Sequence, residues 1–174
     1  MKEYEFTLKL KLAEPESQPE NYLNALAEAG CTDALIGIGQ AGKIALNFIR
    51  EAPSAYEAIS SALAEIRTAI PDSELVEAGP DFVGLTDLAE ILGFSRQNMR
   101  QLVLRNGTFP APIHEGKAAI WHLAKVLNWL KEHKPYSLNE TLLETAQVTL
   151  LLNLARETRE IEPALQAKIK ALPI

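Results

Sequence analysis

The stretch GLTDLAEILGFSRQNMRQL, residues 84–102, has the pattern of two short helices joined by a sharp turn. Thr86 is placed to cap the first helix through its hydroxyl group, and Gly93 predicts the end of that helix. Ser95 then offers a cap for the second helix. The apolar residues of the first helix recur at the spacing of one buried face: they are Leu88, Ile91 and Leu92.

The second helix of this stretch has one apolar and one polar side. Its inner stripe consists of Met99, Leu102 and Val103. At about 100° per residue, Gln97 and Gln101 point away from that stripe, with Asn98 and Arg100 on its two shoulders. Amide side chains pair with adenine and arginine pairs with guanine, whereas Arg96 in the first turn is better placed for a phosphate. The polar face therefore predicts a helix that reads double-stranded DNA.

Residues 109–122 predict a small hairpin, a wing, behind the second helix. Phe109 and Pro110 open it, Lys117 lies at its tip, and Trp121 closes it. A further helix is expected from about Leu123, and it would complete a compact core with the two tryptophans, Trp121 and Trp129.

These features together carry a resemblance. Residues 85–96, LTDLAEILGFSR, with the Phe-Pro wing and a tryptophan before the last helix, resemble the MerR-like winged helix-turn-helix of prophage regulators and excisionases. The resemblance covers about residues 83–131 and implies DNA binding. It places Arg96, Gln97, Asn98, Arg100 and Gln101 on the recognition helix and Lys117 on the wing. Two amphipathic helices joined by a turn also occur in proteins that never bind DNA, so the pattern leaves that alternative open.

Charge is unevenly distributed along the 174 residues, whose net charge is -6. Residues 1–80 hold 6 Lys+Arg against 13 Asp+Glu, whereas residues 81–134 hold 7 against 5. The only positive segment is thus the one with the winged-helix pattern. Because the excess is modest, we expect salt-sensitive binding of middling affinity per module, and a need for two half-sites.

The first 79 residues predict an α+β domain. Alternation from Tyr4 to Leu12 indicates a strand with one exposed face. The apolar patterns that follow predict a helix at 19–29, strands at 34–39 and 43–49, a helix capped by Ser54 with Tyr56 among its inward residues, and a strand at 74–78. This order is that of a ferredoxin-like βαββαβ sandwich, a fold that serves ligand-sensing, partner-binding and structural roles alike.

Three domains are therefore expected: a ferredoxin-like domain at 1–79, a winged helix-turn-helix at 82–134, and C-terminal helices at 136–174. Ser137 is placed to cap a long helix with a broad apolar stripe, and Glu162-Pro163 breaks it before a shorter final helix. Such a stripe either packs across the two domains of its own chain or meets its twin. A symmetric homodimer is favoured, because one helix and one wing read only a few base pairs.

The sequence gives little support to an enzymatic function. His114, His122 and His133 lack the spacing of a metal site, and the glycines of 37–42 precede no helix that would hold a cofactor phosphate. Cys31 is expected to be a buried apolar residue. Without an export signal or an apolar run of membrane length, the chain is predicted to be a cytoplasmic, non-enzymatic DNA-binding regulator with no cofactor and no membrane partner. The alternative is a protein-interaction module whose acidic N-terminal domain binds a basic partner.

Overall fold

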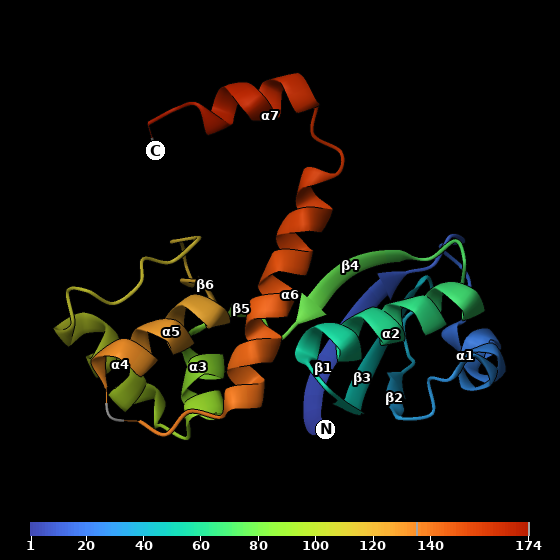
Figure 1. Ribbon diagram of the computed structural model, residues 1–174, viewed down its shortest axis with the longest axis horizontal. Helices are drawn as coiled ribbons and strands as arrows, with labels where there is room; N and C mark the ends of the chain where they lie inside the picture. Colours follow the sequence, from blue (N-terminus) through green and yellow to red (C-terminus); the bar gives the residue numbers. More distant parts are fainter. Residues whose placement is uncertain (135, 174) are drawn as a thin grey trace.

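The computed structural model describes residues 1–134 and 136–173, so residue 174, the predicted end of the third domain, lies outside the described residues. The architecture is mixed α+β (Figure 1). Along the chain the elements are β1 (Lys2–Lys11), a 3-10 turn η1 (Pro19–Tyr22), α1 (Leu23–Ala29), β2 (Ala34–Gly37), β3 (Lys43–Ala52), α2 (Ala55–Ala69), β4 (Glu74–Gly79), β5 (Phe82–Val83), α3 (Leu85–Leu92), α4 (Arg96–Arg105), β6 (Trp121–His122), α5 (Leu123–His133), α6 (Glu140–Thr158) and α7 (Pro163–Lys170).

The first four long strands form one antiparallel sheet with the order β2-β3-β1-β4. Alternate residues of β1 and β3 point to the side covered by α1 and α2 (Figure 1). There Phe6 stacks on its cross-strand partner Phe48, with ring centroids 5.0 Å apart. Ser54 caps α2 as predicted, because its hydroxyl oxygen accepts from the Glu57 amide at 3.2 Å. Tyr56 was expected to point inward and instead is 68% exposed, on the solvent side of the first turn of α2.

The opposite face of this sheet carries exposed side chains. Leu35 and Ile49 are 74% and 56% exposed there, although both are large apolar residues. Ile49 lies opposite Glu5, and Glu51 lies opposite Glu3 in the antiparallel register. Two exposed apolar side chains therefore lie on this face of the sheet, with Glu3, Glu5 and Glu51 near Ile49 and with Lys9, Lys11 and Lys43 towards the other end of the same strands.

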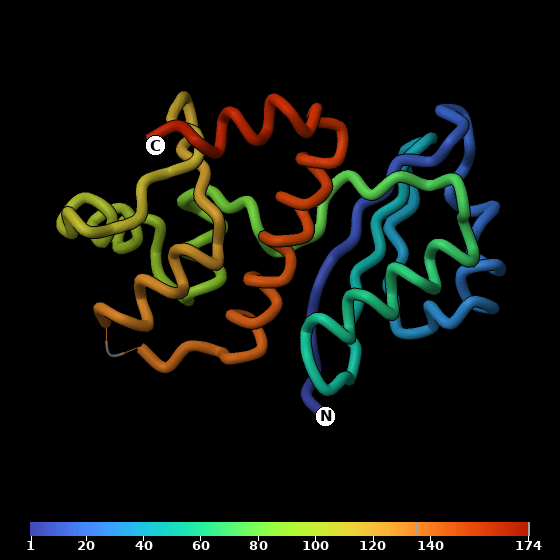
Figure 2. Tube along the Cα trace, turned by 45° about the horizontal axis from the view of Figure 1, so that its top comes forward, coloured from blue at the N-terminus to red at the C-terminus, as the bar shows by residue number. Residues whose placement is uncertain are grey.

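Helix α6 stands between the N-terminal sheet and the helices α3–α5 (Figures 1 and 2). It begins after Asn139, whose side-chain oxygen accepts from the Thr141 and Leu142 amides, so the predicted cap at Ser137 is wrong. Its apolar residues are divided between two cores: Val148 and Leu152 pack on the sheet side, and Leu142, Leu143, Ala146 and Leu150 pack on the α3–α5 side. The broad stripe is thus used largely within the chain, which is the first of its two expected uses.

A buried polar junction joins the N-terminal sheet, the helices α3–α5 and α6. The Asn153 amide donates to the Ala78 carbonyl and to Asp81 Oδ2, both at 2.8 Å, and its oxygen accepts from the Ala78 N–H at 2.8 Å. Asp81 Oδ1 lies 2.7 Å from His122 Nδ1, and the Asp81 carbonyl accepts from the Leu123 amide. The Asn153 side chain of α6 is thereby joined to Ala78 at the end of β4 and to Asp81, and through Asp81 to the start of α5.

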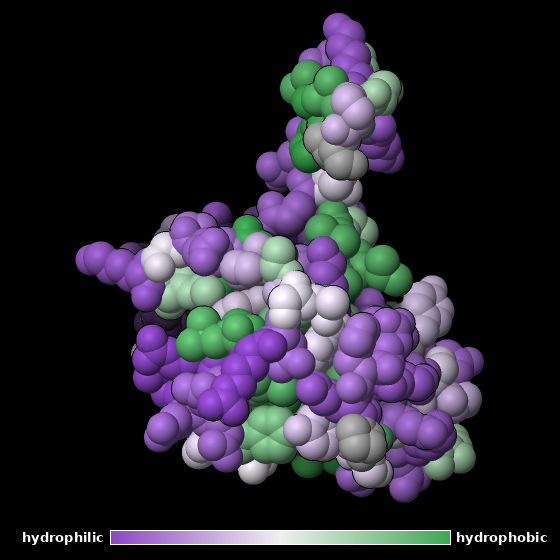
Figure 3. Space-filling model, turned by 90° about the vertical axis from the view of Figure 1, so that its left-hand side faces the viewer, coloured by the Kyte–Doolittle hydropathy of each residue, from purple (hydrophilic) through white to green (hydrophobic). Residues whose placement is uncertain are grey.

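None of the residues of helix α7 is buried. It stands away from the body of the molecule (Figure 3). Large apolar residues in and around it are about half exposed: Ile161, Leu165, Ile169 and Leu172. Among the described residues, no helix combines the length and the apolar character of a membrane span.

Candidate nucleic-acid interface

The predicted pair of helices, α3 and α4, is present with a tight turn between them. Helix α3 begins after Gly84, whose N–H donates to Asp87 Oδ2 at 2.7 Å. The expected cap by Thr86 is therefore wrong, because α3 begins at Leu85 and Thr86 lies inside its first turn; Asp87, the third residue of the helix, binds the Gly84 amide instead. Gly93 ends α3 as predicted, with the left-handed φ of +67° that glycine adopts most readily.

Helix α4 follows with the predicted cap and the predicted inner face. Ser95 Oγ accepts from the Asn98 amide at 3.1 Å. Met99 is fully buried, and Leu102 and Val103 pack on the same core. The helix therefore presents its other side to solvent, and the side of the molecule that carries α4 is mainly hydrophilic (Figure 3).

The predicted base-reading residues Gln97, Asn98, Arg100 and Gln101 are all exposed on this outer side of α4. Arg96, the predicted phosphate contact, is exposed too, and its Nε donates to Thr86 Oγ1 at 3.2 Å. That bond fixes Arg96 across the turn between the two helices. The structure thus brings five of the six predicted site residues onto one helix, free of the protein core.

A depression of about 730 Å³ lies beside α4 and reveals residues that the sequence reasoning missed. Gln97, Asn98 and Gln101 line it together with Arg105 and Lys134. Arg105 is four residues after Gln101 and seven after Asn98, so helical spacing alone would have found it. Lys134 follows α5 and has no such signal; it is held by a hydrogen bond of 3.1 Å from Nζ to Asn106 Oδ1.

The predicted wing differs from the hairpin expected. Its two arms meet in a single isolated bridge between His114 and Ile120. Trp121 pairs instead with Val83 in the short β5–β6 ladder, because its indole is drawn into the core, where Nε1 donates to the Pro110 carbonyl at 2.9 Å. Lys117 is exposed in the turn, and the turn stands apart from α4 in both views (Figures 1 and 2).

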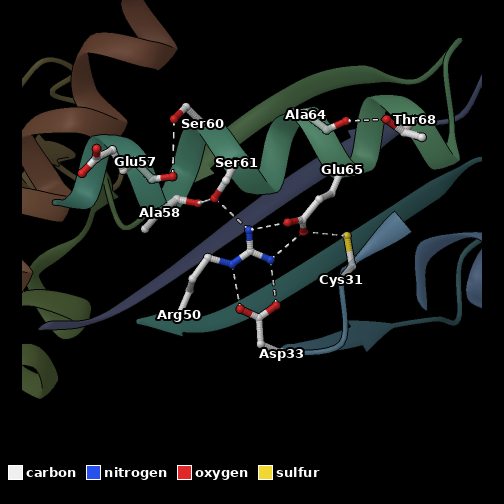
Figure 4. A network of polar contacts seen from close by, with 10 residues as sticks. All are labelled: Cys31, Asp33, Arg50, Glu57, Ala58, Ser60, Ser61, Ala64, Glu65 and Thr68. Carbon is white, nitrogen blue, oxygen red and sulfur yellow. Dashed lines mark hydrogen bonds and ion pairs between the residues drawn. The ribbon is translucent and has the colours of Figure 1, made fainter. Parts of the chain in front are cut away.

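A second polar cluster lies between β3 and α2 in the N-terminal unit (Figure 4). Arg50, only 8% exposed, makes a two-bond ion pair with Asp33 at 2.7 and 2.8 Å. Two further bonds join it to Glu65 at 2.6 and 3.1 Å, and one joins it to Ser61. All of its partners are protein groups, so the cluster is read as a structural tie between strand and helix.

Cys31 lies at the edge of this cluster and is buried, as expected from the sequence. Burial, reinforced by the neighbouring Glu65 carboxylate, raises the pKa of the thiol to about 11. The thiolate is therefore scarce at neutral pH, and Cys31 is unsuited to act as a nucleophile. The described residues contain no group of three or more His, Cys, Asp or Glu side chains arranged to hold a metal ion.

The Arg50 cluster makes folding stability depend on acid pH. Hydrogen bonds from the Arg50 guanidinium hold the pKa of Asp33 below its usual value. A lowered folded-state pKa contributes stability above the ordinary aspartate pKa of about 4, and this contribution is lost as the pH falls through the lowered value. We expect Asp33→Asn to cost about 1 to 3 kcal/mol at pH 7.

The same variant should lose less stability than the parent when the pH is lowered from 5 to 2, as measured by urea unfolding. Asp72→Asn is the matched control, because Asp72 is exposed in the turn after α2. An Asp33→Asn protein with the parent's full acid dependence would contradict this assignment.

Comparisons with known protein families, with curated proteins and with solved structures find no match to this chain. The class of the molecule therefore follows from its own structure. It is a mixed α+β protein in which a four-stranded antiparallel sheet and a set of short helices are joined through one long helix. Its most distinctive exposed feature is the polar face of α4.

Proposed function

We propose that the protein is a non-enzymatic regulator that binds double-stranded DNA in a sequence-specific way, in the manner of prophage regulators and excisionases. Residues 82–134 form the winged helix-turn-helix in this proposal, and residues 1–79 form a ferredoxin-like sandwich that supports it. The observation that carries the proposal is the outer face of α4, where amides and arginines are exposed on a helix whose other side is anchored by Met99. Such a face offers the donors and acceptors that base edges in the major groove require.

Phosphate contacts in this proposal come from the cations around α4. Arg96 and Arg105 stand at the two ends of the helix, and Lys134 lies beside it. Lys117 adds a cation from the wing. Because the N-terminal unit is strongly acidic, the DNA backbone is directed to the α4 side. The proposed place of action is the cytoplasm, and no cofactor is needed for this activity.

The proposed working form is a homodimer assembled through the C-terminal helices. Helix α7 exposes an apolar stripe, and an apolar groove of about 290 Å³ lies between α2 and α6, lined by Tyr56, Leu63, Val148 and Leu151 among others. Insertion of α7 from a second copy would cover both surfaces in a self-complementary way. Two α4 helices would then read two half-sites.

Salt dependence tests the backbone contacts. Arg105→Ala and Lys117→Ala should each weaken binding to all duplexes alike and reduce the slope of log K against log salt by about 1. Fluorescence anisotropy on a mixed-sequence duplex at several salt concentrations measures this. Lys43→Ala, on the acidic N-terminal unit, is the control, and an equal effect of that control would remove the case for a local DNA surface.

A second candidate function has its own observation, the exposed face of the sheet, where Leu35 and Ile49 are uncovered and carboxylates lie beside Ile49. This surface fits a basic protein partner, which would make the chain an adaptor or an antitoxin-like module. A Leu35→Asp variant of the full chain discriminates the two functions. If the parent retains no DNA at low salt and the Leu35→Asp variant no longer captures a basic protein that the parent captures, the adaptor is favoured. If the variant binds DNA as the parent does, the regulator is favoured.

A further inference from the structure

A cavity of about 490 Å³ opens between the end of α2, the start of β4 and the last turns of α6, away from α4. One part of its wall is apolar and consists of Leu10, Leu63, Leu75 and Leu152. Its volume lies within the range of about 300 to 1,000 Å³ that is usual for small-molecule sites. The cavity is thus large enough for a ligand of modest size.

Three arginines share the rest of the wall: Arg67, Arg156 and Arg159. The Arg67 guanidinium is held by two backbone carbonyls, those of Pro71 at 2.7 Å and Ser73 at 3.3 Å, which position its charge without neutralising it. Among the described residues, neither Arg67 nor Arg159 forms an ion pair.

Arg156 is the third arginine of the wall, and only part of its guanidinium is paired with protein groups. Its Nη2 pairs with the adjacent Glu157, while its Nε is buried and has no hydrogen-bond partner in the described structure. A buried donor without an acceptor costs free energy, so such groups are rare in folded proteins.

Carboxylates are present at the rim, but within the described residues none of them pairs with Arg67 or Arg159. Glu74 and Glu160 also line the cavity, and neither lies within ion-pair distance of a guanidinium among the described residues. Counting Glu157, which pairs with Arg156, three cations stand beside three anions, so the unpaired positive charge of this wall lies at Arg67 and Arg159. Arginine forks match carboxylate, sulfonate and phosphate oxygens in two-bond geometry.

We propose that this cavity binds a small amphipathic organic anion, with its acidic group at Arg156 and Arg159 and its hydrocarbon part against the leucines. Leu152 immediately precedes Asn153 on α6, and Arg156 follows it by three residues. Asn153 is the residue that joins the sheet to Asp81, before α3. Occupation of the cavity would therefore bear on the junction between the two units. Only this regulatory consequence rests on the proposed DNA-binding function; the binding itself does not.

Octanoate is the probe for the full chain, and isothermal titration calorimetry is the measurement. Octanol keeps the hydrocarbon without the charge, and inorganic phosphate keeps the charge without the hydrocarbon. We expect octanoate to bind at one site per chain and each of the other two compounds to bind at least about tenfold more weakly. Equal binding of phosphate and octanoate would overturn the amphipathic site, as would equal binding of octanol.

Variants locate the site. Arg156→Gln should weaken octanoate binding about tenfold or more, and Lys125→Gln, at an exposed position of α5, should leave it unchanged. If Arg156→Gln fails to fold, as thermal unfolding would show, the exposed Arg159→Gln replaces it with the same expectation. Octanoate binding that neither arginine variant alters, or that is absent in the parent, would overturn the proposal whether or not the protein binds DNA.

Discussion

Asn153→Ala should lower the free energy of unfolding by about 2 to 4 kcal/mol, because it leaves several buried polar groups without partners. The amide of Asn153 makes three hydrogen bonds of 2.8 Å, two to the Ala78 backbone and one to the Asp81 carboxylate. Asp81 is 1% exposed, so water cannot easily replace the lost donor. Urea unfolding followed by tryptophan fluorescence measures the effect, since Trp121 and Trp129 both lie beyond the junction.

Leu154→Ala is the matched control for this variant, because Leu154 is the next residue of α6 and is 47% exposed. It should cost well under 1 kcal/mol, as surface substitutions usually do. The Asn153→Ala protein should also unfold over a broader range of urea concentration, because α6 would no longer couple the two units. If Asn153→Ala lowers the free energy of unfolding by less than about 1 kcal/mol, the junction does not hold the N-terminal sheet and the helices α3–α5 together.

Changing Gln97 and Gln101 together to alanine should remove the preference for a selected DNA site, since each good base contact is worth about 1 to 3 kcal/mol. The two changes together are therefore expected to cost about 2 to 6 kcal/mol on that site. Binding to unrelated duplexes should persist, because the arginines that contact phosphates remain. Competition of selected against random duplex measures this difference.

The fold of the variant is not expected to change, since both glutamine side chains are exposed and alanine is well tolerated in a helix. Arg105→Ala serves as the comparison, because it should weaken both duplexes by the same factor. If the double glutamine variant also weakened both duplexes equally, the face assigned to base reading would be wrong.

Local patterns in the sequence predicted much of the architecture. The alternation from Tyr4 to Leu12 places β1 correctly, and Ser54 and Ser95 cap α2 and α4 as expected. These signals depend on neighbours three or four residues away, so the sequence displays them directly. Thr86 failed as a cap for an equally local reason, because α3 begins one residue earlier, at Leu85, where the Asp87 carboxylate binds the Gly84 amide.

Features that join distant segments could not be predicted in the same way. The bonds of Asn153 to Ala78 and Asp81 span more than seventy residues, and nothing near Asn153 in sequence announces them. The predicted wing hairpin is reduced to the bridge between His114 and Ile120, and Trp121 pairs with the distant Val83 instead. Lys134 reaches the depression beside α4 only because α5 folds back on the same core.

The C-terminal stripe shows how one pattern serves two purposes. Its width on α6 suited either intrachain packing or a dimer, and the structure uses most of it between the two units. Leu151 remains 65% exposed on the outer side of α6, and α7 stays uncovered. The proposed dimer therefore depends on α7 and the groove beside α2, rather than on the whole stripe.

Selection of the purified full chain on random duplex DNA at two salt concentrations tests the central claim most directly. Sequencing of the retained duplexes should show enrichment of a two-fold-symmetric site, with retention that falls as salt is raised. Such a site would support both the reading face of α4 and the homodimer. Absence of retention even at low salt would contradict the DNA-binding function and leave the exposed sheet face as the better candidate surface.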